Sequence, residues 1–495
     1  MSTQATAPLT DHESAVVSAA PRQLLIGGTW VDATGGATFD VLDPSTGEAL
    51  CAVADAGPDD GRRALDAAVR AQAGFAGSSP RERADILTRA FELLHERIDD
   101  LALLMTLEMG KPVAEAKGEI AYAAEFFRWF GEEAVRIDGG YQTAPAGGAR
   151  FLVTRQPVGP CLLIAPWNFP MAMGTRKIGP AIAAGCTSVV KPAHQTPLSM
   201  LALGAILLEA GLPHGVVNIV TCVQAGAVME PLIRSGLARK LSFTGSTKVG
   251  KVLLAQCAEK VLRTSMELGG NAPFIVFEDA DLDEAVAGAM AAKMRNMGEA
   301  CTAANRIYVH ESIIDEFGAR LAAKMAALTV GRGTQDGVDV GPLIDEAAQR
   351  KVTDLVADAV GRGATVLTGG GEHGGAGYFY EPTVLTGVPA DARMAGEEIF
   401  GPVAPLTPFA TEAEVVAAAN DTPYGLVAYV YTNDLRRALR VGEAIETGMV
   451  GLNQGVVSNP AAPFGGVKES GLGREGGSVG IDEFLEVKYI GIATG

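Results

Sequence analysis

The segment VGPCLLIAPWNFPMAMGTRKIGPAIAAGCTSVVKP, residues 158–192, decides the fold class of this chain. Its apolar runs VGPCLLIAP (158–166) and CTSVVKP (186–192) have the length of strands, and residues 171–184 between them have the length of a helix. Similar runs recur along the chain: VVNIV (216–220), KLSFTG (240–245), RTSMEL (263–268) and PFIVF (273–277). Helices are predicted between them near 199–210, 225–235 and 248–258. Strands that alternate with helices of this length predict a parallel, doubly wound α/β sheet.

Polar residues follow three of these strands, and in such sheets ligands bind at the carboxyl ends of the strands. They are Trp167 and Asn168 after the first strand, Lys191 and His194 after the second, and Gly245 and Ser246 after KLSFT. Ser246 opens a helix, so it either caps that helix or helps free backbone amides to hold a phosphate. Lys191 is either a solvated strand end or a ligand of ribose or phosphate oxygens. The GxGxxG dinucleotide fingerprint is absent.

A candidate nucleophile lies in KMRNMGEACTAANR, residues 293–306. A thiol attacks as thiolate, and Arg295 or Arg306 beside Cys301 would lower a pKa that starts near ~8.5. The alternative is a buried structural cysteine, since free cysteine is among the most buried residue types. Asn296 and Glu299 break the apolar stripe that a core helix would show just before the sulfur, which favours the nucleophile.

Glu267 is a candidate general base. It ends an apparent strand and precedes two glycines, and a carboxyl group at such an edge abstracts protons when its surroundings raise its pKa toward neutrality. The sequence leaves open whether Glu267 lies beside Cys301.

Bulk composition limits the classes of protein. With 495 residues, the chain is too long for one simple core and predicts two or more domains. The net charge of −18 argues against non-specific nucleic-acid binding. Six scattered cysteines without a CxxC pair predict neither a disulfide framework nor a metal site, and they indicate a reducing, cytoplasmic location. No apolar stretch reaches the ~20 residues that span a bilayer, and residues 1–20 read as a flexible tail.

Together these segments resemble the aldehyde dehydrogenase superfamily over essentially the whole chain after residue 20. The matching motifs, in order, are PWNFP (166–170), KPAHQTP (191–197), FTGSTKVG (243–250), ELGG (267–270), NMGEAC (296–301), EEIFGPV (397–403) and PFGGVKESGLGRE (463–475). The branch that the chain resembles most is that of the succinate-semialdehyde dehydrogenases.

The resemblance implies a three-part architecture. A Rossmann-like cofactor domain would comprise residues 21–133 and 150–266, and an α/β catalytic domain residues 267–460. A small β bridging element, residues 134–149 and 477–495, would build homodimers or homotetramers.

The resemblance also implies roles in catalysis. Cys301 would attack the aldehyde carbonyl, and Asn168 with the Cys301 backbone N–H would hold the oxyanion of the thiohemiacetal. After hydride transfer to the nicotinamide, Glu267 would activate the water that hydrolyses the thioester. No metal is implied.

Ligand-binding positions follow in the same way. The cofactor, NADP or NAD, would contact Trp167, Lys191, His194, Gly245, Ser246, Leu268, Glu398 and Phe400. Many NAD-preferring relatives carry a Glu at position 194 that repels a 2′-phosphate, so His194 predicts that NADP is accepted at least comparably to NAD. Arg176, Arg295 and Ser458 match positions that bind the substrate carboxylate.

Two departures from the family pattern matter. The usual Gln two residues before the nucleophile is Glu299, which would raise the pKa of Cys301 if it pointed inward. Ala303 stands where some succinate-semialdehyde enzymes have a second cysteine, so a local redox disulfide is excluded. The implied function is NAD(P)-dependent oxidation of succinate semialdehyde. The alternatives are oxidation of glutarate semialdehyde or an aromatic aldehyde, or a non-catalytic protein on the same fold.

Overall fold

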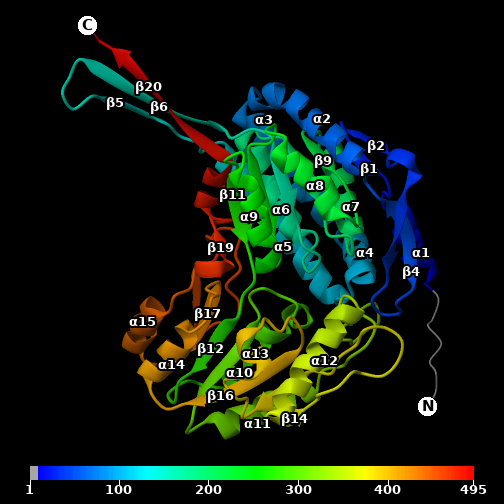
Figure 1. Ribbon diagram of the computed structural model, residues 1–495, viewed down its shortest axis with the longest axis vertical. Coiled ribbons are helices and arrows are strands. Elements are labelled where there is room, and N and C mark those ends of the chain that lie inside the picture. The colour runs from blue at the N-terminus through cyan, green and yellow to red at the C-terminus, as the bar shows by residue number, and fades with distance from the viewer. Residues whose placement is uncertain (1–8, 495) are drawn as a thin grey trace.

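The computed structural model describes residues 9–494. Two α/β bodies lie one above the other along the long axis, and an antiparallel β arm extends from the upper body (Figure 1). Both bodies are built on mainly parallel sheets, so the predicted α/β fold class is confirmed.

The upper body contains an eight-stranded sheet of order β19-β11-β10-β7-β8-β9-β1-β2. Its parallel centre is formed by the strands predicted from the apolar runs, and β19, β1 and β2 are antiparallel additions at the edges. The strands are β1 (Leu24–Ile26), β2 (Thr29–Val31), β7 (Cys161–Ile164), β8 (Ser188–Lys191), β9 (Val217–Ile219), β10 (Lys240–Thr244), β11 (Arg263–Glu267) and β19 (Gly471–Leu472). The helices are α2 (Pro58–Ala76), α3 (Pro80–Glu96), α4 (Ile98–Met109), α5 (Val113–Ala134), α6 (Ala172–Ala184), α7 (Pro197–Glu209), α8 (Ala225–Arg234) and α9 (Thr247–Ala258).

The lower body contains a seven-stranded sheet of order β14-β15-β16-β13-β12-β17-β18, in which only β14 is antiparallel. The strands are β12 (Ala272–Val276), β13 (Ala304–His310), β14 (Thr365–Thr368), β15 (Thr383–Thr386), β16 (Val403–Phe409), β17 (Val427–Tyr431) and β18 (Met449–Leu452). The helices are α10 (Leu282–Met294), α11 (Ile314–Ala326), α12 (Glu346–Gly361), α13 (Arg393–Gly396), α14 (Glu412–Asn420) and α15 (Leu435–Ala444).

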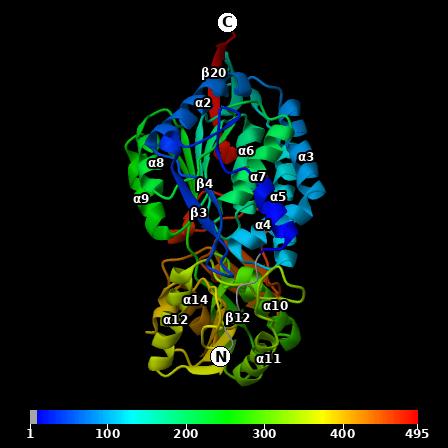
Figure 2. The same ribbon diagram turned by 90° about the vertical axis from the view of Figure 1, so that its right-hand side faces the viewer.

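The arm is a three-stranded antiparallel sheet of β5 (Gly140–Thr143), β6 (Ala149–Pro157) and β20 (Leu485–Ala493) (Figure 1). All of β6 pairs within this sheet, so the arm extends beyond residue 149, where we predicted its first segment to end. The other domain boundaries, at 133, 266 and 460, stay predictions. A separate hairpin joins β3 (Thr38–Leu42) to β4 (Ala49–Ala54), which lie across the upper body in Figure 2.

The N-terminal segment differs from the prediction of a flexible tail. Asp11–Ala19 form helix α1, whose first turn is closed by a capping box between Thr10 and Glu13. Val16 and Val17 are buried in the upper core, which holds the helix in place. The prediction is therefore wrong for this helix, and residues 1–8 lie outside the described residues.

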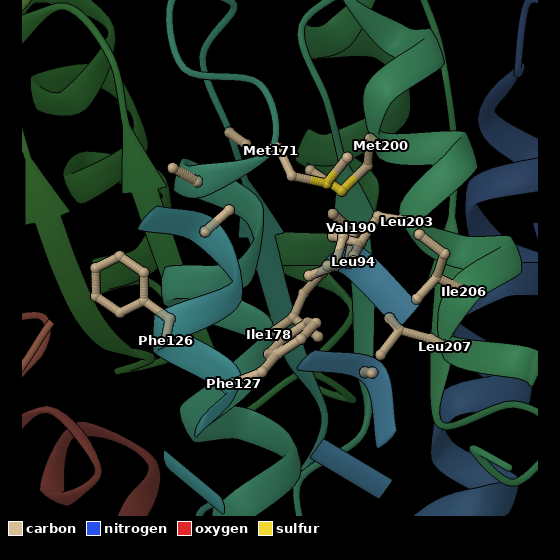
Figure 3. Close-up of a cluster of buried hydrophobic side chains, with 14 of the residues drawn as sticks. Leu94, Phe126, Phe127, Met171, Ile178, Val190, Met200, Leu203, Ile206 and Leu207 are labelled. Carbon is tan, nitrogen blue, oxygen red and sulfur yellow. The ribbon is translucent and has the colours of Figure 1, made fainter. Parts of the chain in front are cut away.

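The hydrophobic core of the upper body holds helix α6 in place. Side chains of α5, α6 and α7 interdigitate there, with Phe127 and Ile178 packed toward Leu203 and Leu207 (Figure 3). All of α6 is buried, so its first turn has little freedom to move. Within residues 9–494, no helix is both long and apolar enough to cross a membrane.

Candidate active site

A cavity of about 270 Å³ contains most of the predicted site residues. It lies beyond the carboxyl ends of β7, β10 and β11, whereas the sequence predicted the ligand site beyond β7, β8 and β10. Cys301 is part of its lining. The predicted residues that line it are Trp167, Asn168, Arg176, Gly245, Ser246, Leu268, Arg295, Cys301, Glu398, Phe400 and Ser458.

The turn before Cys301 is a strained backbone segment. Asn296 and Met297 have φ of 55° and 54°, a region that residues with a Cβ rarely adopt. Gly298 follows with φ of 79°, and a Cβ there would lie 2.2 Å from the Gly401 carbonyl oxygen. Such strain persists only where the surroundings impose it, and it gathers at functional sites. The turn therefore presents Cys301 at the end of a fixed loop.

The thiol of Cys301 is protonated at neutral pH in this cavity. Burial, with the nearby charge of Glu398, raises its pKa to about 12, although Arg176 and Arg295 act in the opposite direction. The predicted net lowering of this pKa is therefore wrong. Arg306 takes no part, because its guanidinium donates to backbone carbonyls that include Asn271 and Ala419.

Glu299 points away from the nucleophile. Its Oε1 accepts a hydrogen bond of 3.1 Å from the Ile344 backbone N–H, and burial raises the pKa of its carboxyl well above the usual range. The carboxyl group of this unusual residue is thus directed toward the Ile344 backbone.

Asn168 lies across the cavity wall from the Cys301 loop. Its side-chain Nδ2 donates to the Glu299 carbonyl oxygen at 2.9 Å, two residues before the nucleophile. An amide nitrogen carries two hydrogens, so the second N–H remains for an oxygen in the cavity. The side chain is buried, which strengthens any interaction with a developing oxyanion.

Glu267 ends β11 and is buried without a hydrogen bond to either carboxyl oxygen. Burial and the nearby Glu475 raise its pKa well above the usual range. It lies outside the lining of the main cavity, yet its charge helps to raise the pKa of Cys301. An unpaired carboxyl with a raised pKa near a nucleophile has the properties of a general base.

Two arginines line the cavity, and they differ in their partners. Arg176 is buried, donates to the Tyr122 hydroxyl at 2.5 Å and lies 3.7 Å from a Glu475 oxygen. Arg295 is half-buried and donates to the Ser458 hydroxyl at 3.4 Å. Among residues 9–494 it forms no ion pair with a carboxylate, so its charge is available to a ligand.

The cavity is also lined by Trp167, Ser246, Glu398 and Phe400, which the sequence predicted to contact the cofactor. Phe400 has φ of 57° and its ring meets the Trp167 ring edge-on at 5.4 Å. Glu398 accepts a hydrogen bond of 3.0 Å from the Gly270 N–H, and burial raises its pKa to about 7. The Ser246 hydroxyl caps α9 by accepting from the Val249 N–H at 3.4 Å, so the capping interpretation is confirmed.

Lys191 and His194 lie outside the lining of the main cavity. Lys191 is buried at the end of β8, and its ammonium group has no hydrogen bond or ion pair within the described part of the chain. Burial lowers its pKa. Desolvation and the charge of Lys191 lower the pKa of His194. An unpaired buried cation at the carboxyl end of β8 fits a site for ribose or phosphate oxygens.

A model of the aldehyde dehydrogenase family matches residues 30–490. The chain belongs to the aldehyde dehydrogenase family. This aldehyde dehydrogenase is 59% identical to a succinate-semialdehyde dehydrogenase from Paenarthrobacter nicotinovorans, over 90% of this chain and 99% of the relative. It is 53% identical to the succinate-semialdehyde dehydrogenase [NADP(+)] of Escherichia coli K12, over 95% of this chain and 97% of the relative.

A solved structure agrees with the fold. A succinate-semialdehyde dehydrogenase from Burkholderia pseudomallei superposes on this aldehyde dehydrogenase with a TM-score of 0.95 and 52% sequence identity. The match covers 96% of this chain and 99% of that chain. The aldehyde dehydrogenase fold, inferred from the motifs, is thereby confirmed.

Several cavity residues of this aldehyde dehydrogenase escaped the sequence analysis. Tyr122 bonds Arg176, and the Phe464 ring lies 4.1 Å from the Arg176 guanidinium carbon. Phe464 belongs to the motif PFGGVKESGLGRE, so the sequence could have indicated it. No motif includes Tyr122, because the sequence of its helix is typical of a structural helix. The other lining residues not predicted are Pro166, Phe169, Met173, Thr244, Gly269, Thr302, Ala348 and Lys351.

Proposed function

We propose that this chain oxidises succinate semialdehyde to succinate with NADP or NAD. The observation that carries the proposal is the position of Arg295, a cation without a carboxylate partner among the described residues, in the same cavity as Cys301. Together with Arg176 and the Ser458 hydroxyl, it provides a site for the carboxylate at the far end of the substrate. Two relatives, 59% and 53% identical, are named for this substrate, whereas two others, 51% and 52% identical, are named glutarate-semialdehyde dehydrogenase.

The first step is addition to the aldehyde. The Cys301 sulfur, after loss of its proton, forms a bond to the carbonyl carbon, and the carbonyl π electrons move to oxygen. The free N–H of Asn168 and the Cys301 backbone N–H hold that oxyanion. The raised pKa of Cys301 means that its proton must first be lost to solvent water.

The second half of the reaction releases the acid. A bound NAD or NADP would supply the acceptor for the hydride of the substrate carbon, which would leave a thioester on Cys301. Glu267 takes a proton from water, the oxygen adds to the thioester carbon, and the C–S bond breaks with its electrons returning to sulfur. Succinate leaves and the thiolate is regenerated.

The cofactor would lie along the side of the cavity opposite Arg295. Phe400 and Glu398 would contact the nicotinamide ring and its ribose, and Trp167, Gly245 and Leu268 would complete the wall. The N-terminus of α9 at Ser246 would face the diphosphate. Lys191 and His194 would lie by the adenosine ribose, where neither opposes a 2′-phosphate.

Oligomeric state and location are part of the proposal. The arm exposes Tyr141, Val487, Tyr489 and Ile490, an apolar set that supports a homodimer or homotetramer built through it. The six cysteines are all free, which supports a reducing cytoplasm.

An aldehyde panel tests the function. The purified chain is mixed with NAD or NADP and with succinate semialdehyde, glutarate semialdehyde, butanal or benzaldehyde, and the absorbance of the reduced cofactor is followed. Succinate semialdehyde should give the highest kcat/KM. Cys301→Ala should abolish oxidation and retain cofactor binding, because the sulfur forms the covalent bond and holds no part of the dinucleotide. A preference for butanal, or turnover near wild type in Cys301→Ala, would refute the assignment.

A further inference from the structure

A buried ion pair lies directly behind the loop that carries Asn168. Lys111 follows α4, and its Nζ lies 2.5 Å from Oε2 of Glu119 in α5. Both side chains are 1% exposed. Lys111 does not line the cavity that contains Cys301, so it has no direct access to an aldehyde or a cofactor there.

The two partners hold the loop at both ends. Lys111 Nζ donates to the Asn168 carbonyl oxygen at 2.8 Å. Oε1 of Glu119 accepts from the backbone N–H groups of Met171 and Ala172, at 3.0 and 3.1 Å. Helix α6 has no side-chain cap from its own N-terminal residue, so Glu119 satisfies these amides in its place. The ion pair thereby connects residue 168 to the first turn of α6.

Asn168 is held from a second direction by the nucleophile loop. Asn296 Nδ2 donates to the Asn168 carbonyl oxygen at 3.0 Å and to the Glu299 carbonyl oxygen at 3.0 Å. The Asn168 carbonyl oxygen thus accepts two hydrogen bonds, and Lys111 supplies the charged one, which is the stronger kind. Since Asn168 Nδ2 also donates to Glu299, the direction of its remaining N–H is set by this network.

The energetics favour a positioning role over a stabilising one. Taking two charges out of water costs about as much as their attraction returns, so well-packed apolar residues often replace a buried ion pair without loss of stability. Oxyanion binding depends steeply on where the donor points, and a displacement of about 1 Å costs roughly 100-fold in rate. A charge-assisted bond to the backbone of the donor residue restricts that displacement.

We propose that Lys111, held by Glu119, is a positioning residue that fixes Asn168 for oxyanion binding. This inference rests on the proposed function, because it assigns Lys111 to the step in which Asn168 acts. Lys111 would act on the oxyanion through Asn168, and its ammonium group also lies 4.3 Å from the centre of the Phe169 ring.

A double-mutant cycle tests that coupling. Lys111→Met keeps the unbranched side chain up to its fourth atom and removes the ammonium donor. We expect kcat/KM for succinate semialdehyde to fall about 100-fold, with the loss in kcat and little change in KM, because ground-state binding does not use the oxyanion. In an Asn168→Ala background the same change should cost less than about threefold, since the donor that Lys111 positions is already gone.

The control is Arg83→Met. Arg83 is another buried cation that donates to a carbonyl at an end of α6, here that of Ala183 at 3.0 Å, remote from Asn168. It should lower kcat less than about threefold. A kcat loss in Arg83→Met equal to that in Lys111→Met would mean that any loosening of α6 suffices, and it would overturn the positioning role.

Because Lys111→Met leaves Glu119 buried and unpaired, the cycle is repeated with Lys111→Met/Glu119→Gln, in which the amide oxygen still accepts from Met171. The same non-additivity is expected. Equal fold-losses in the wild-type and Asn168→Ala backgrounds would overturn the inference and leave the proposed function intact. If Asn168→Ala itself keeps full activity, the oxyanion role fails, and the role of Lys111 fails with it.

Discussion

The charge of Arg295 should select the substrate. The guanidinium carbon of Arg295 lies 4.8 Å from the centre of the Phe169 ring. Replacing Arg295 by Met keeps most of the aliphatic part of the side chain and removes the cation. A carboxylate about 4 Å from a cation gains about 4 kcal/mol at the effective dielectric of a protein surface. Arg295 is half-buried, so water screens part of this. We therefore expect a loss of about 2–4 kcal/mol in transition-state stabilisation for succinate semialdehyde, within the range for one partner of a desolvated charge pair.

That free energy corresponds to a fall in kcat/KM of about 30- to 1000-fold. Butanal has the same chain length without the carboxylate, so its kcat/KM should fall less than about threefold. Initial rates of cofactor reduction, measured with both aldehydes on wild type and Arg295→Met, give the two ratios. Equal losses with both aldehydes would show that Arg295 does not recognise the carboxylate, and the substrate assignment would fail.

Arg176 is a poorer probe of the same question, although the sequence placed the two arginines on an equal footing. It contacts Tyr122 and Glu475, and its charge lowers the pKa values of both Glu267 and Cys301. Arg176→Ala should therefore lower activity on butanal as well as on succinate semialdehyde.

Three further predictions concern the base, the cofactor and stability. Glu267→Gln should give a pre-steady-state burst of reduced cofactor followed by slow turnover, and a normal steady-state rate without a burst would remove Glu267 from the mechanism. NADP should be used at least comparably to NAD, whereas His194→Glu should shift the preference to NAD; a wild-type kcat/KM for NAD more than about 100-fold above that for NADP would contradict this. Burial raises the pKa of Glu108 to about 7 from 4.5, so the folded state binds its proton more tightly and this group's contribution to the free energy of unfolding is lost as pH rises from 4.5 through 7. When urea unfolding is measured from pH 4.5 to 7, the free energy of unfolding should fall by about 3 kcal/mol less in Glu108→Gln than in wild type. Parallel curves of this free energy against pH for the two chains would refute the prediction.

The sequence alone determined the frame of the site. Apolar runs of strand length separated by helices predicted the parallel sheet, and the order of the chain placed polar residues after β7, β8 and β10. Parallel strands end at one edge, so Asn168 and Ser246 had to approach one another. Cys301 was recognisable because the residues before it cannot form a core helix. These properties depend on neighbours within one turn or one strand, which the sequence displays directly.

Only the tertiary structure decided the hydrogen bonds, pKa values and unpaired charges of the site. Asn168 and Glu299 are 131 positions apart, yet the Asn168 side chain donates a hydrogen bond to the Glu299 carbonyl oxygen. The flanking cations were expected to activate Cys301, but burial outweighs them and Arg306 is occupied elsewhere. Lys111 resembles an ordinary residue between two helices, and only packing places it behind Asn168. A pKa, a free cation or a shared hydrogen bond depends on every group within a few ångströms, and most of those groups come from distant parts of the chain.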